Sequence, residues 1–233
     1  ALSISSLALA LVALRFRETL PRERRTPMHP AALARNWVTV LHHPSFRAWS
    51  LLTLLTFAGL MTFLTTSPFV FTEVLGLSRL QYGVSIFSMS VFYIAGTFLC
   101  RRLLAAMGLR KTVAVAAAMS LTSGSLLGAF TLANVAYLGT LLPCLWLYAM
   151  AHGIHQSCGQ AGAVAPFPRM AGAASAMNGF LMMVAAFGTG LWLSHSIDGT
   201  LFPLAHGIAF WGVALALTAW TLVQWHGEPV QAD

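Results

Sequence analysis

The sequence predicts an all-α membrane protein: a six-transmembrane-helix bundle together with the remnant of a preceding helix. Its 233 residues are 58% apolar and only 8% charged, whereas soluble domains carry roughly 25% charged residues. Long stretches without a charge alternate with short basic segments, which is the pattern of helices that cross a bilayer several times. This composition excludes a soluble core.

Charge-free intervals set the number of spans. Those without Asp, Glu, Lys or Arg are 1–14, 48–72, 80–100, 112–168, 170–197 and 199–227. Most match the roughly 20 residues that a helix needs to cross the hydrocarbon layer. The interval 112–168 would reach about 85 Å as one helix, so we expect it to turn back near Ala133, Asn134 and Val135. Residues 48–227 then contain six whole spans.

We expect residues 1–14 to form a truncated transmembrane helix, the sixth of a longer protein. At the helical rise they reach only about 21 Å, short of the roughly 30 Å hydrocarbon layer. Neither an initiator Met nor a basic leader is present. We therefore expect the sequence to be a fragment, with residues 228–233 as a cytoplasmic tail.

Residues 15–47 form the expected central loop, which is rich in Arg and Pro at its start. Four apolar side chains recur in its second part at helical spacing: Leu33, Trp37, Val40 and Leu41. This stripe predicts a short helix between Pro30 and Pro44 that lies along the membrane interface. Because the stripe is short, an irregular loop remains the alternative.

Basic residues gather on one side of the predicted bundle. Twelve of the thirteen Lys and Arg fall in 15–47, in RRLLAAMGLRK at 101–111, or at Arg169, and only Arg79 falls on the other side. Lys and Arg in short loops stay on the cytoplasmic side of a membrane. Topology thus explains the net charge of +7 without a nucleic-acid partner.

Small residues recur within the spans at the spacing that lets helix backbones approach each other. They are Gly124 with Gly128, Gly159 near Gly162, Ala171 to Ala174, and Gly188 with Gly190. Cys100, Cys144 and Cys158 lie in or beside apolar runs without CxxC spacing. We therefore expect the cysteines to be packing residues and not a disulfide framework or a zinc site.

Polar side chains inside two spans form the candidate substrate cavity. They are His152, His155, Gln156 and Gln160 on the fourth span, and Thr65 and Ser67 on the first. Polar and titratable groups at membrane depth usually face the bundle interior and mark a substrate or proton path. His152 and His155, three residues apart, are expected to share a helix face.

Other interpretations of these side chains stay open. The histidines can be neutral and satisfied by neighbouring helices, and the hydroxyls can bond to carbonyls of their own helix. A metal site of His152, His155 and Cys158 is disfavoured, because the three spread around the helix and no carboxylate is near. No HExxH, GxSxG or nucleotide loop occurs, so we expect neither an enzyme nor a cofactor.

Several stretches resemble the C-terminal half of a major facilitator superfamily transporter, of the Bcr/CflA type of drug:proton antiporter. They are RETLPRERR, HHPSFRAWSLLTLLTFAGLMTFLTTSPFVFTEVLGLSRLQYG, APFPRMAGAASAMNGF, and the DGT at Asp198. MGLRKT is similar to the basic loop between the second and third helices of each half in that family. The acidic residue of the family's loop motif is missing here.

The resemblance implies two six-span halves, of which this chain holds the end of the sixth span, the central loop and spans seven to twelve. The expected function is efflux of drug-like or small organic molecules by proton antiport with alternating access, in the bacterial inner membrane. The expected partners are lipid, the missing N-terminal half, the substrate and protons. No Asp or Glu lies deep inside a whole span, so a carboxylate proton carrier would belong to the missing half.

The basic loop is expected to make topology and gate contacts at the cytoplasmic face. Its residues are Arg101, Arg102, Gly108, Arg110 and Lys111. Three other functions remain open: uptake of a metabolite by the same fold, a passive channel, and a membrane scaffold subunit without transport activity.

Overall fold

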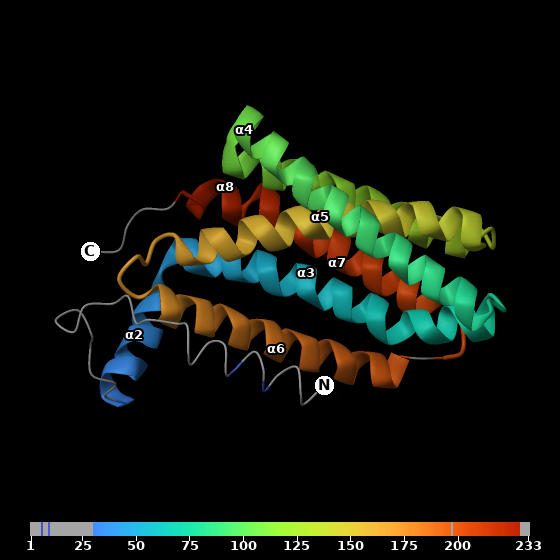
Figure 1. Cartoon of the computed structure of the whole chain (residues 1–233), viewed down its shortest axis with the longest axis horizontal. Helices are drawn as coiled ribbons and strands as arrows, with labels where there is room; N and C mark the ends of the chain where they lie inside the picture. Colours follow the sequence, from blue (N-terminus) through green and yellow to red (C-terminus); the bar gives the residue numbers. More distant parts are fainter. Residues whose placement is uncertain (1–5, 7–8, 10–29, 197, 229–233) are drawn as a thin grey trace. The chain divides into compact units, whose positions relative to one another are not determined.

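A computed structural model describes residues 6, 9, 30–196 and 198–228. Most of the expected helix remnant at 1–14, and residues 15–29 of the expected central loop at 15–47, therefore lie outside the described residues. The chain divides into two compact units, 1–35 and 36–233, and the bundle discussed below belongs to the second (Figure 1). Within the described residues every regular element is a helix.

The bundle opens with α3, which runs from Pro44 to Phe69 and continues as the π-helical turn η2, Val70–Val74. Pro44 occupies the first turn of α3, where a missing N–H leaves no hydrogen bond unmade. Pro68 lies inside the last turn, and the helix widens to π geometry directly after it. The helix α2, Pro30–His42, precedes this bundle.

The next helix, α4, extends from Arg79 to Leu132 and consists of two segments that meet at Gly108. The side chains and backbone N–H groups of Ser78 and Gln81 bond reciprocally and cap its start. Gly108 has φ 78° and ψ 177°, a conformation that glycine alone adopts without strain. The expected turn over 101–111 is therefore too long: helical backbone continues on both sides of this single glycine.

Three further helices complete the bundle: α5, Leu138–Val164; α6, Ala171–Ser196; and α7, Phe202–Trp220, which is followed by the short α8, Leu222–His226. Asn134 at φ 56° makes the turn between α4 and α5, where the sequence predicts a reversal. Four described stretches are long and apolar enough to span a membrane: Pro44–Val74, Arg79–Leu132, Ala171–Ser196 and Phe202–His226. With α4 counted as two segments and α5 included, the bundle has six membrane-length helical segments, and the all-α membrane fold is confirmed.

Contacts across the bundle identify which helix ends lie together. At the Gly108 end, Trp49 Nε1 donates to the Gly227 carbonyl at 3.1 Å, and Gln224 Nε2 donates to the Arg110 carbonyl at 3.2 Å. At the opposite end, η2 packs on the start of α4. Arg110 and the neighbouring basic residues of α4 therefore lie at the same end as the N-terminus of α3 (Figure 1).

Glycines mark the places where the helices approach most closely. A β-carbon on Gly124 would lie 2.8 Å from the Ala209 backbone, so the predicted close approach there is confirmed for α4 and α7. At Gly188 and Gly190, by contrast, a β-carbon would have no neighbouring atom within 4 Å among the described residues, so the predicted close packing is not seen at this pair within the described part of the chain. The reason is geometric: spacing along α6 does not fix which face meets a neighbour.

Candidate functional site

A cavity of about 510 Å³ lies between α3, the first segment of α4, and α5. Its lining residues are Phe57, Leu60, Phe63, Leu64, Ile86, Met89, Ser90, Tyr93, Ile94, Leu145, Tyr148, Ala149, His152 and Gln156. The α5 members recur every three or four residues and therefore share one helix face. An apolar wall with a few polar groups is the usual composition of a small-molecule site.

His152 is the most constrained polar group of this cavity. Its side chain is only 6% exposed, and its Nδ1 lies 2.8 Å from the Thr56 hydroxyl on α3. The ring of Tyr93, from α4, packs 5.6 Å away between centroids. Because Nδ1 is engaged by Thr56, the ring orientation is fixed from α3, and Nε2 makes no hydrogen bond among the described residues.

Of the other predicted polar residues on α5, only Gln156 joins His152 in lining the cavity. Gln156 is partly buried and its Oε1 has no protein partner within the described chain. His155 is fully buried, with neither ring nitrogen hydrogen-bonded in the described chain, and it does not line this cavity. Gln160 is exposed and also lies outside the lining.

The hydroxyls predicted on the first span do not reach the cavity. Thr65 is exposed, and Ser67 is buried with its Oγ 3.3 Å from the Tyr82 hydroxyl. Thr62 and Thr66 donate to the carbonyls four residues earlier. These two threonines therefore bond within their own helix.

Sequence reasoning missed the two tyrosines of the cavity, Tyr93 and Tyr148. The Tyr148 side chain is 4% exposed and its hydroxyl has no partner among the described residues. A β-carbon on Gly59 would overlap that hydroxyl. Tyr148 therefore fits against α3 only because residue 59 has no side chain. A glycine opposite an aromatic residue is visible only once the helices are placed, so no sequence signal could have found this pair.

The predicted gate residues surround the break in α4. Arg110 forms an ion pair with Glu228, beyond α8, and Thr112 Oγ1 donates to the Gly108 carbonyl at 2.7 Å. The remaining basic side chains, Arg101, Arg102 and Lys111, are exposed. The ion pair of Arg110 thus links the break in α4 to the segment that follows α8. No cluster of three metal-ligating side chains occurs within the described part of the chain.

The comparisons with known proteins agree with the fold. The sequence profile of the Major Facilitator Superfamily matches residues 1–190. The chain belongs to the major facilitator superfamily. It is 24% identical over 181 residues, 78% of this chain, to an uncharacterized superfamily-type transporter, YdgK, of Bacillus subtilis strain 168. The match spans 45% of that relative, so the chain covers about half of its length.

Membership of this superfamily, together with the apolar helices, makes the chain a multi-pass membrane protein. Transporter folds of this kind build their substrate sites near the bilayer midplane, where two repeated bundles meet.

Proposed function

We propose that the chain is the C-terminal half of a Bcr/CflA-type efflux transporter and that the His152 cavity is its contribution to the substrate site. The observation that carries this proposal is a single imidazole, held by Thr56, in a mainly apolar cavity of about 510 Å³. Such a cavity accepts drug-like organic molecules of varied shape, and its few polar groups orient them.

The chemistry of the cavity suits a proton-coupled exporter. The free Nε2 of His152 can take a proton or bond to a ligand, and Gln156 Oε1 offers an unpaired acceptor beside it. No Asp or Glu lines the cavity. In this proposal His152 is the local proton-responsive group, whereas a carboxylate carrier belongs to the N-terminal half.

The proposed orientation in the membrane follows from the charge distribution. The Gly108 end of the bundle carries the basic residues of α4 and is taken as the cytoplasmic end in the bacterial inner membrane. Rocking of this bundle against an N-terminal half would then expose the cavity to either side in turn. The ion pair of Arg110 with Glu228 lies at the end that must open to admit a cytoplasmic substrate.

Replacement of His152 in the intact two-half protein tests the proposal. His152→Phe keeps a ring of similar size but removes both nitrogens, so proton-driven chloramphenicol transport into inverted vesicles should fall at least tenfold. His206→Phe is the matched control, because His206 is exposed and stacks on Phe202 outside the cavity. Unchanged transport and pH dependence in His152→Phe would contradict the proposed site, and transport only in right-side-out vesicles would indicate uptake.

A further inference from the structure

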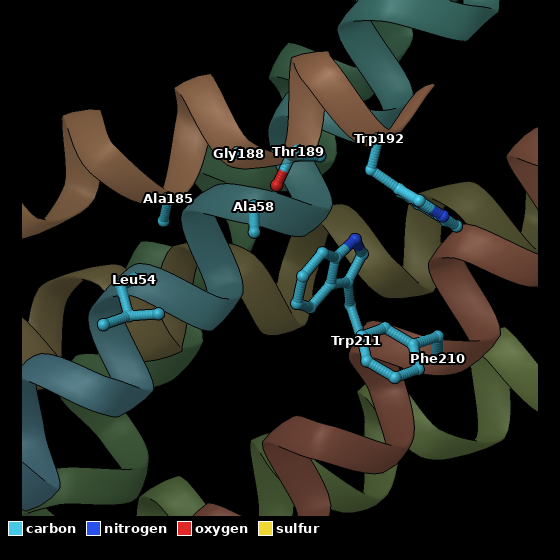
Figure 2. Close-up of a pocket in the computed structure, with 8 residues that line it drawn as sticks. All are labelled: Leu54, Ala58, Ala185, Gly188, Thr189, Trp192, Phe210 and Trp211. Carbon is cyan, nitrogen blue, oxygen red and sulfur yellow. The ribbon is translucent and has the colours of Figure 1, made fainter. Parts of the chain in front are cut away.

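A second cavity, of about 430 Å³, lies between α3, α6 and α7. Figure 2 shows its lining residues: Leu54, Ala58, Ala185, Gly188, Thr189, Trp192, Phe210 and Trp211. It shares no residue with the His152 cavity. On α6 the lining positions are three or four residues apart, so one face of this helix forms a wall of small side chains that ends at Trp192.

The cavity contains a hydroxyl, that of Thr189, without a hydrogen-bond partner among the described residues. The Thr189 side chain is only 4% exposed. Thr53, Thr62 and Thr66 all donate to the carbonyl four residues earlier, as hydroxyls in apolar helices commonly do. In Figure 2 the Thr189 hydroxyl instead points toward Ala58, across the space between α6 and α3.

Three aromatic side chains supply the other contacts that a ligand in this cavity could make. Trp211 Nε1 is committed, because it donates to Thr62 Oγ1 at 2.8 Å. The indole N–H of Trp192 has no protein acceptor within the described chain, and a tryptophan can only donate. Trp192, Trp211 and Phe210 therefore offer ring surfaces for stacking, while Thr189 offers an unused donor.

We propose that this cavity binds a neutral, planar aromatic molecule that carries a hydrogen-bond acceptor. The volume lies within the range of small-molecule sites, which is roughly 300–1,000 Å³. No charged side chain lines the cavity, so an ionic ligand would be desolvated at membrane depth without a counter-ion. The site is separate from the His152 cavity and does not depend on the proposed efflux function.

Coumarin, a neutral planar lactone, is a suitable probe. Its equilibrium binding to the intact protein in lipid nanodiscs can be followed by quenching of tryptophan fluorescence. Gly188→Leu should fill the cavity without a backbone clash, because no atom lies within 4 Å of the β-carbon position at Gly188. Gly179→Leu is the matched control on the same helix: Gly179 is equally open and does not line the cavity.

We expect saturable binding that Gly188→Leu weakens at least tenfold and Gly179→Leu leaves unchanged. Thr189→Val preserves the side-chain volume and removes the donor, so it should weaken binding about three- to tenfold. If Gly188→Leu alters the melting temperature, Thr189→Val is the variant that tests whether coumarin binds in this cavity. His152→Phe should bind coumarin normally, which keeps this result independent of the efflux test.

Two outcomes would overturn the assignment. Equal affinities for the wild type, Gly188→Leu and Thr189→Val would show that coumarin binds elsewhere. The second outcome would come from native mass spectrometry. A phospholipid that co-purifies with the wild type and is lost from Gly188→Leu would show that an acyl chain occupies the cavity.

Discussion

A β-carbon on Gly96 of α4 would overlap the carbonyl oxygen of Met150 on α5. One turn along α5, a β-carbon on Gly153 would lie 2.6 Å from the Tyr93 carbonyl oxygen. The two backbones are therefore in direct contact on both sides of this crossing. Since Tyr93 and His152 line the same cavity, the crossing fixes the distance between two of its walls.

Gly96→Ala should destabilise the protein, because the added methyl group meets backbone and not a mobile side chain. Overpacking of this kind costs about 1–3 kcal/mol, measurable as a lower melting temperature in detergent. Gly83→Ala is the control on the same helix, since nothing lies within 4 Å of its β-carbon position. Equal melting temperatures for the two variants would contradict the crossing.

Thr56→Val should release the ring of His152. The variant keeps the shape of the side chain and removes the hydroxyl that holds Nδ1 at 2.8 Å, a hydrogen bond worth about 1 kcal/mol. Transport by the intact protein should fall several-fold, and Thr56→Ser should restore it. In Thr66→Val, the control, the lost hydroxyl bonds only within α3; a similar fall in both valine variants would argue against a specific role of the Thr56 contact.

Cys100 and Cys158 place their sulfur atoms 3.4 Å apart across α4 and α5, and both are free and buried. Copper phenanthroline, an oxidant that enters membranes, should therefore join them in the intact protein: two copper(II) ions each accept one electron, and the two thiol protons are released. Mass spectrometry of peptides would detect the bond, and Cys100→Ser should abolish it. Cross-linking of Cys144 instead would contradict this geometry.

Asp198, in the turn between α6 and α7, has its pKa lowered from the usual range by hydrogen bonds from the side chain and backbone of Thr200. A lowered pKa stabilises the fold above the unfolded-state pKa, and this contribution is lost as the pH falls through the folded-state pKa. Thr200→Val should therefore raise the pKa of Asp198.

Carbon-13 labelling of aspartate measures this pKa directly, because the chain has only one other Asp, Asp233. The Asp198 titration midpoint should move to higher pH in Thr200→Val. Ser196→Ala is the control, since the Ser196 hydroxyl bonds to the Trp192 carbonyl. A midpoint that stays in place in Thr200→Val would show that Thr200 is not the cause of the shift.

The number of helices and the turn at Asn134 could be predicted because they follow from where charges are absent. A charge-free interval has to match the thickness of the hydrocarbon layer, so its length alone determines a span. At the Gly108 break the sequence predicts a turn over 101–111, because Arg101, Arg102, Arg110 and Lys111 separate two charge-free intervals. Helical backbone tolerates these side chains where they reach water or an ion-pair partner, so charge content does not set where the helix ends.

The candidate site was only partly predictable. His152 and Gln156 are four residues apart on α5 and line one cavity, whereas His155, though only three residues from His152, is buried outside it. Because α5 has neighbouring helices on most sides, a small rotation of α5 about its axis changes which side chains face the cavity. Sequence spacing does not give that rotation. Tyr93 and Tyr148 carry no motif, so their place in the cavity follows only from the helix crossing.

The single non-helical residue at Gly108 has a consequence for protease susceptibility. Trypsin cleaves after Lys and Arg; four such residues lie within the sequence 101–111, and Arg101, Arg102 and Lys111 are exposed. Nicking occurs at flexible loop tips, whereas these residues belong to helical backbone on either side of the glycine. Limited digestion of the folded protein should therefore leave the whole of α4 as one uncut fragment.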